Sequence, residues 1–233
     1  MTPDALKEHV FGTYLSLRFG MAMIATIFPT SIWLVGEFCG VPLQDSLSAY
    51  YWADGFVSAP VRTWFVGGLF ALAAFFYLYK GFTVGENYAL NLAAIFAIGV
   101  AALPMEWQCQ DCTGLFSAHG VSAVLLFGCL GYVVVLRSRD TLKHLPQHEH
   151  ESDDEHKLAV SRYRRTYIAL GTLMLLSPLV AFFLNSIVGK QTTIVFFVEA
   201  AGVEAFAAFW WVKSFEMRRS KVTRRALKAE IEV

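Results

Sequence analysis

The chain has 233 residues, of which 56% are hydrophobic and only 16% are charged, and its formal net charge is zero. This composition excludes an ordinary soluble domain, in which about a quarter of the residues carry a charge. The balanced charge, and the lack of any interleaving of basic with aromatic residues, argue against nucleic acid as a partner. The expected class is therefore an integral membrane protein.

Six apolar segments are long enough to cross a membrane as helices. The hydrocarbon core is about 30 Å thick and a helix rises about 1.5 Å per residue, so one crossing takes about 20 residues. The sequence thus predicts an all-α, polytopic bundle of six transmembrane helices within a membrane domain that covers residues 19–213. The predicted segments are residues 19–37, 61–80, 88–105, 117–136, 166–188 and 192–213.

The positions of lysine and arginine predict the orientation of this bundle. Basic residues in short connecting segments stay on the cytoplasmic side of a membrane. Alternate connecting segments hold nearly all of them, whereas the other set holds only Arg62 and Lys190. We expect both termini in the cytoplasm and a multi-pass location in the plasma membrane of a bacterium, the inner membrane. The expected cytoplasmic parts are an N-terminal segment (1–18), a His-rich and acidic loop (137–165) and a basic tail (214–233).

Three cysteines, Cys39, Cys109 and Cys112, lie on the predicted outer side. Cys109 and Cys112 form a C-x-x-C motif just beyond a helix end, and an oxidising exterior favours a disulfide between them. This bond either closes the loop or takes part in thiol–disulfide exchange, with Cys39 resolving it and a quinone accepting the electrons. The exchange alternative resembles quinone-linked oxidases of the DsbB kind in outline, although this chain has no second outer pair of cysteines.

A polar loop joins the first two predicted helices and leads to an arginine at the mouth of the second. Its hydroxyl groups and its arginine can hold a lipid headgroup or a phosphate, because arginine is a planar donor of several hydrogen bonds. The alternative is an interfacial loop whose arginine extends toward the headgroups. The candidate residues are Asp45, Ser46, Ser48, Tyr50, Tyr51 and Arg62.

The pattern Ser46-x-Ser48-x-Tyr50-Tyr51, followed by Arg62-x-x-Phe65-Val66-Gly67, resembles a set of uncharacterised bacterial six-helix membrane proteins. More remotely, the chain resembles the Frag1/DRAM/Sfk1 group of membrane proteins. These resemblances imply a six-helix membrane fold and no established reaction.

A second comparison is with the ceramidase and progestin-receptor superfamily, whose zinc site uses several histidines and a Ser-x-x-x-His pattern. In this chain Trp52 follows Ser48 at the position of that histidine, and His119 is the only histidine within a predicted helix. The sequence therefore predicts no metal site, and it assigns no cofactor.

Two carboxylates, Glu199 and Glu204, lie within the last predicted helix. A charge at the bilayer centre costs about 2.5–3.5 kcal/mol on insertion scales, so both side chains must face protein or water. At 100° per residue the two carboxylates point about 140° apart, and Glu199 lies about 10 Å below the outer surface. We expect Glu199, His119 and Arg62 to line one outward-facing pocket, and interhelical hydrogen bonding is the alternative.

Three functions are compatible with these residues. The preferred one is binding of a lipid or a small ligand in the outward-facing pocket formed by the loop residues, His119, Glu199 and Glu204. The second is a membrane enzyme, either a thiol oxidoreductase that uses the C-x-x-C motif or a lipid hydrolase that uses Ser48 and His119. The third is a transporter or a proton-coupled pathway, because buried carboxylates can relay protons. The expected partners are membrane lipids and such a ligand, and the bundle is compatible with a homo-oligomer.

Overall fold

The computed structural model describes residues 3–53, 60–106, 116–143, 145, 152–188 and 193–220. All regular secondary structure in this part of the chain is helical, which confirms the predicted all-α class. The elements are α1 (Pro3–Phe38), the 3₁₀-helix η1 (Ser48–Tyr51), α2 (Pro60–Leu78), α3 (Val84–Ala102), α4 (Ala118–Tyr132), the π-helical turn η3 (Val133–Arg137), α5 (Ser138–Leu142), α6 (Asp153–Val188) and α7 (Ile194–Ser220).

Six helices among the described residues are long and apolar enough to cross a membrane. Each overlaps one of the six predicted segments, so the predicted number of crossings is confirmed. The spans are Glu8–Phe38, Pro60–Leu78, Val84–Ala102, Ala118–Leu142, Asp153–Leu184 and Ile194–Arg218. By the length and composition of these helices, the chain is a multi-pass membrane protein.

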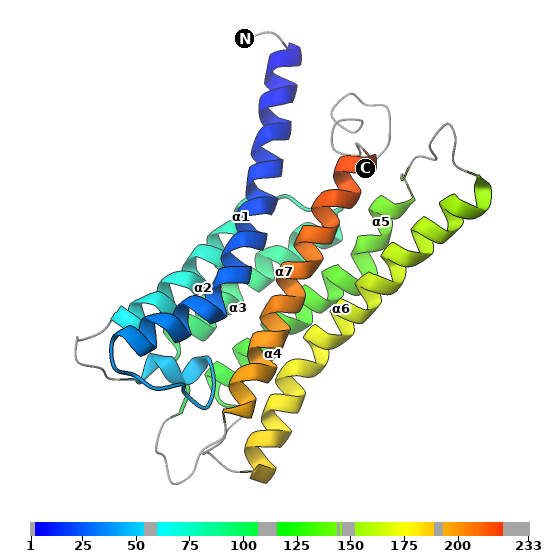
Figure 1. The fold of residues 1–233 in the computed structure, drawn as a ribbon. Helices are drawn as coiled ribbons and strands as arrows, with labels where there is room; N and C mark the ends of the chain where they lie inside the picture. The colour runs from blue at the N-terminus through cyan, green and yellow to red at the C-terminus, as the bar shows by residue number, and fades with distance from the viewer. Residues whose placement is uncertain are drawn as a thin grey trace.

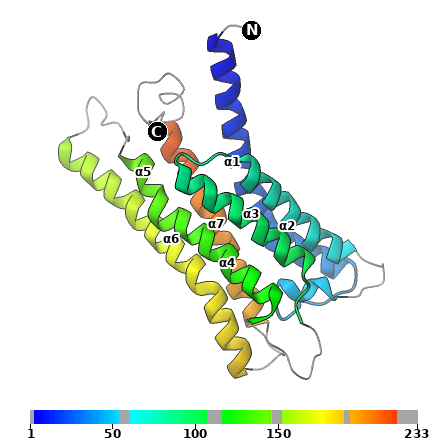
Figure 2. The same ribbon diagram turned by 180° about the vertical axis from the view of Figure 1, so that it is seen from behind.

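The spanning helices form a closed ring (Figures 1 and 2). In this ring α1 packs against α2, α2 against α3, α3 against α4, α4 against α6, α6 against α7, and α7 against α1. Helix α1 begins and α7 ends at the same end of the ring, which we call the terminal end (Figure 1). The short helix η1 lies at the opposite end, which we call the η1 end.

Large apolar side chains point outward from every spanning helix. In water such a surface would exceed the apolar patches that monomeric soluble proteins expose, whereas in lipid it is solvated. The outside of the ring therefore supports a membrane location. Examples, one from each span, are Ile27, Phe70, Ile95, Leu125, Phe183 and Phe197, each of which is more than 40% exposed.

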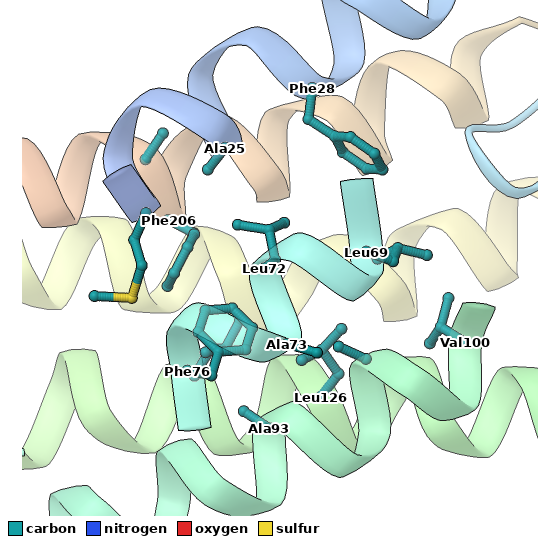
Figure 3. Packing of buried hydrophobic residues seen from close by; sticks show 14 of the residues in the cluster. Ala25, Phe28, Leu69, Leu72, Ala73, Phe76, Ala93, Val100, Leu126 and Phe206 are labelled. Carbon is teal, nitrogen blue, oxygen red and sulfur yellow. The ribbon is translucent and has the colours of Figure 1, made fainter. Parts of the chain in front are cut away.

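The middle of the ring is filled by apolar side chains (Figure 3). The rings of Phe76 on α2 and Phe206 on α7 meet edge to face, with centroids 5.4 Å apart. Close approach of α1 to α2 depends on Gly68, because a Cβ atom there would lie 2.2 Å from Cε2 of Phe28. Leu126 of α4 contributes to the same cluster. This apolar layer separates the polar groups at the two ends of the ring.

Several helices are longer than the apolar segments predict. Helix α3 begins at Val84, before the predicted start at residue 88, because the Thr83 hydroxyl accepts a hydrogen bond from the Glu86 amide, 3.4 Å away. The Glu86 carboxylate accepts the Phe82 amide at 2.9 Å and so satisfies a second free donor. Residues 3–18 and 153–165, predicted as an N-terminal segment and as part of a loop, continue α1 and α6 as polar helical turns.

Candidate functional site

The segment 39–53, which we call the η1 loop, begins with a tight turn at the end of α1. Gly40 has a φ of 76°, in the left-handed region that glycine adopts without strain. The Val41 amide then donates to the Gly36 carbonyl oxygen at 2.8 Å and closes the turn. The Tyr50 ring is fully buried against Gly36, where a Cβ atom would approach it to 2.9 Å. These contacts fold the loop back over the η1 end.

Two further hydrogen bonds fix the position of η1. The Phe196 amide of α7 donates to the Asp45 carbonyl oxygen at 2.8 Å, which ties the loop to the start of α7. The Ser46 hydroxyl accepts the Ala49 amide at 3.0 Å, as a serine does in the turn that starts a helix. The η1 loop is thus anchored both to its own backbone and to α7.

Glu199 of α7 caps the beginning of η1. Its Oε2 atom accepts the Leu47 amide at 2.7 Å, and the carboxylate also accepts the Ser48 amide. The first amides of a helix have no partner within that helix and attract negative charge. The carboxylate predicted to line a pocket therefore binds the backbone of the η1 loop.

His119, near the start of α4, contacts the side chain of Ser48. Its Nδ1 atom lies 2.8 Å from the Leu103 carbonyl oxygen, and because a carbonyl can only accept, Nδ1 carries the proton. In a neutral imidazole this leaves Nε2 as the acceptor, and Nε2 lies 3.0 Å from the Ser48 Oγ atom. His119 is buried, whereas Ser48 is partly exposed. A serine hydroxyl thus donates to an imidazole whose orientation a third group fixes.

Arg62, in the first turn of α2, caps the other end of η1. Its Nε atom donates to the Tyr51 carbonyl oxygen at 2.6 Å, and its guanidinium carbon lies 4.8 Å from the Tyr51 ring centroid. The Trp52 ring centroid is 5.8 Å from the same carbon, and the Trp52 indole donates to the Met105 carbonyl oxygen at 2.8 Å. A cation at the carboxyl end of a helix complements the helix dipole.

The structure therefore brings Glu199, His119 and Arg62 to three points along η1. Glu204 lies farther along α7, and the contacts described around η1 involve Glu199, Arg62 and His119 instead. Binding of a ligand at this end stays a prediction. Cys109 and Cys112 lie outside the described residues, and Cys39 is a buried free cysteine just after α1.

The sequence analysis missed a second polar cluster, which lies buried at the terminal end. Helix α7 continues past the predicted end at Lys213, and the Nζ atom of Lys213 lies 3.0 Å from Oε2 of Glu216. Lys213 also donates to the Ser138 carbonyl oxygen at 3.1 Å and to the Thr141 hydroxyl. Lys213 is 2% exposed and Glu216 is 0% exposed. A charged pair is therefore enclosed where the sequence predicted the end of the last spanning helix, at Lys213, and the start of a basic tail.

The Glu216 carboxylate connects three helices at this end. Its Oε2 atom accepts the Tyr167 hydroxyl of α6 at 2.8 Å and the Thr141 hydroxyl of α5 at 3.1 Å. Its second oxygen has no hydrogen-bond partner in the described part of the chain. The sequence signal for this cluster is the spacing of Lys213 and Glu216 by three residues, which places both side chains on one helix face.

The fold and its two polar clusters define a multi-pass helical membrane protein with candidate sites at both ends of the ring. No family model, curated protein or solved structure matches the chain. The functional assignment therefore depends on the geometry of these sites.

Proposed function

We propose that the protein is a membrane-embedded serine hydrolase that cleaves an ester bond of a lipid at the η1 end. The observation that carries the proposal is the 3.0 Å contact between Ser48 Oγ and His119 Nε2, with His119 Nδ1 held by the Leu103 carbonyl oxygen. An activated serine requires a base at about 2.6–3.2 Å and a third group that orients the base. Ser48, His119 and Leu103 fill these three roles.

The reaction would proceed in two steps. Ser48 Oγ attacks the carbonyl carbon of the ester and gives its proton to His119 Nε2, and the bond to the alcohol breaks as the alcohol takes that proton. Water then attacks the acyl-serine and gives a proton to His119, which returns it to Ser48 Oγ as the acid leaves. The products are one carboxylic acid and one alcohol for each water consumed.

The surroundings of Ser48 favour an amphipathic substrate. Tyr51, Trp52 and Arg62 lie at the boundary of the apolar ring, where aromatic rings and arginine meet lipid headgroups. The guanidinium fork of Arg62 offers donors to an anionic headgroup. Glu199 acts as a positioning residue, since it holds the amides of Leu47 and Ser48 and thereby sets the place of the serine hydroxyl.

Several groups expected to line an open pocket have partners within the chain. Glu199 binds the start of η1, Arg62 binds its end, and His119 binds Ser48. This arrangement favours a hydrolase, in which the serine and histidine must touch, over a binding site whose polar groups await a ligand. A protein that only binds lipid should show neither labelling of Ser48 nor ester hydrolysis in the test below.

A fluorophosphonate probe tests the proposal, because it labels a serine only when a base activates it. We expect the purified protein in nanodiscs to be labelled at Ser48, with no label in Ser48→Ala and a labelling rate reduced about 100-fold in His119→Gln. Ser31→Ala is the matched control, since the Ser31 hydroxyl donates only to the Phe28 carbonyl oxygen of its own helix. A folded protein that is neither labelled at Ser48 nor able to hydrolyse lipid esters would overturn the proposal.

We also propose, from the distribution of lysine and arginine, that the η1 end faces outward from a bacterial inner membrane. Reporter fusions at His150 test this orientation, and an exterior signal there would contradict it.

On that outer side we propose a disulfide between Cys109 and Cys112, with Cys39 and Cys129 reduced. Alkylation before and after reduction distinguishes these thiols, and free Cys109 and Cys112 without reductant would exclude the bond.

A further inference from the structure

Arg18 of α1 is a buried cation at the terminal end, with 1% of its surface exposed. No carboxylate forms an ion pair with it in the part of the chain that the structure describes. Its guanidinium contacts the sulfur of Met217, 2.6 Å from Nη1, and is hydrogen-bonded to the Tyr79 hydroxyl. Because a buried charge without a counter-charge is strongly unfavourable, the surroundings of Arg18 favour the binding of an anion.

Helix α7 presents further donors beside this guanidinium. Trp210, Ser214 and Met217 are spaced by four and three residues and therefore lie on one face of the helix. The Trp210 ring packs against Tyr79 with centroids 5.0 Å apart, while Met217 contacts Arg18. Tyr79 and Arg18 thus both lie against this face of α7. Ser214 is placed between Trp210, which contacts Tyr79, and Met217, which contacts Arg18.

Three buried polar atoms in this group have no hydrogen-bond partner among the residues that the structure describes. They are Nε of Arg18, Nε1 of Trp210 and Oγ of Ser214, on residues that are 1%, 0% and 0% exposed. All three can donate a hydrogen bond, and the first two can only donate. Buried donors are nearly always paired in folded proteins, so a group of three unpaired ones points to an acceptor that joins them.

We propose that Arg18, Trp210 and Ser214 bind a phosphate group that enters from the terminal end. A guanidinium with an indole N–H and a hydroxyl matches the several acceptor oxygens of a phosphate. The nearby carboxylates interact with Lys213. Glu216 is the ion-pair partner of Lys213, and the strongest attractive charge acting on Glu86 is also that of Lys213. The phosphate belongs either to a lipid headgroup or to a soluble phosphate compound.

Two neighbouring residues support access to this site. The Met217 sulfur is only a weak acceptor, so it competes poorly with a phosphate oxygen for the guanidinium. The next residue, Arg218, is exposed, and its guanidinium lies 4.6 Å from the centroid of the Phe19 ring. Since Phe19 follows Arg18 in the chain, Arg218 places a second cation at the surface beside the site, where it attracts anions.

Direct binding measurements on the full chain in maltoside micelles, which contain no phosphate, test this site. Inorganic phosphate and short-chain phosphatidic acid are titrated separately, and binding is followed by ³¹P NMR. We expect saturable binding of at least one probe, and Trp210→Phe and Ser214→Ala each to weaken it about tenfold, the effect of one charge-assisted hydrogen bond. Binding of phosphatidic acid alone identifies a lipid headgroup as the source, and binding of inorganic phosphate alone identifies a soluble compound.

Matched controls separate a binding role from a structural one. Trp211→Phe removes an indole that already donates to the Thr26 hydroxyl, and Ser177→Ala removes a hydroxyl that donates to the Met174 carbonyl oxygen. Both controls should bind phosphate as the wild type does. Arg18→Gln should abolish binding, but because it alters a buried charge, the decision rests on the two donor variants. The proposal is overturned if neither probe binds, or if Trp210→Phe and Ser214→Ala bind as tightly as their controls.

Discussion

The two ends of the ring stabilise charged side chains in different ways. At the η1 end, Glu199 and Arg62 each bind backbone groups of one short helix, and both are only partly buried. At the terminal end, Lys213 and Glu216 bind each other and are almost completely enclosed. A charge that binds backbone amides depends on the local path of the chain, whereas a buried pair depends on both of its members.

This difference indicates separate roles for the two ends. The η1 end holds a loop in place through single hydrogen bonds, so it can position a reactive serine at a partly exposed surface. The terminal end joins α5, α6 and α7 through Glu216 and its three donors. Because an apolar layer that includes Phe76 and Phe206 lies between them, changes at one end should add to changes at the other.

The largest effect is expected from breaking the buried pair. Glu216→Met removes the ion-pair partner of the buried Lys213 ammonium and should lower the free energy of unfolding by about 3–5 kcal/mol. The double variant Lys213→Met with Glu216→Met removes both charges and should cost much less than the two single changes together. Unfolding of Lys213→Met, Glu216→Met and the double variant in mixed micelles measures this coupling. Additive effects of the single changes would show that the two residues act independently.

The next effect tests the apolar layer between the ends. In Gly68→Ala the new Cβ atom would lie 2.2 Å from the Phe28 ring, so we expect a loss of about 1–3 kcal/mol through overpacking. Gly67→Ala is the matched control, since no atom of the described residues beyond its own helix turn lies within 4 Å of a Cβ atom there, and it should be stabilising by about 0.5–1 kcal/mol. Equal thermal stabilities of the two variants would contradict the close contact of α1 with α2.

A smaller effect is expected from the cap of η1. Glu199→Gln keeps the shape of the side chain but weakens the bonds to the Leu47 and Ser48 amides, at a cost of about 1–2 kcal/mol. Labelling of Ser48 should slow at the same time, because the neutral side chain of the new glutamine holds the η1 loop less firmly than the carboxylate does. Glu204→Gln is the control and should change stability by less than about 0.5 kcal/mol. Identical labelling rates in the two variants would remove the positioning role of Glu199.

The sequence predicted the spanning helices because lipid imposes length and apolarity on each segment separately. It also singled out Glu199 and His119, since a polar side chain within an apolar helix needs a partner. The partners themselves were not predictable, because the contacts of Ser48 with His119 and of Leu47 with Glu199 depend on how the η1 loop folds back. These pairs are 71 and 152 residues apart in the chain.

The terminal cluster was missed for a different reason. Lys213 follows the last apolar run and precedes several basic residues, so its charge is typical of a solvated tail. Only the continuation of α7 to Ser220, beside the additional turns of α5 and α6, encloses Lys213 and Glu216. Apolarity marks where a helix can enter lipid, but it does not mark where that helix ends.

The smallest effect is a pH dependence at the η1 end. Burial of the Tyr50 phenol, assisted by the charge of Glu37, raises its pKa above the ordinary value of 10.0, and the hydrogen bond from the Gln44 amide only partly offsets this. The unfolded chain therefore loses the phenol proton at a lower pH than the folded chain does. The stabilisation is complete below about pH 10 and is lost as the pH rises through the folded-state pKa.

Tyr50→Phe removes this titration, so its thermal stability should fall less steeply than that of the wild type between about pH 9 and pH 11. Near neutral pH the variant should lose less than about 1 kcal/mol, since the bond from the Gln44 amide is long, at 3.4 Å. Parallel alkaline slopes for the two proteins would mean that Tyr50 ionises as readily in the folded chain as in the unfolded one, and that the η1 loop does not enclose it.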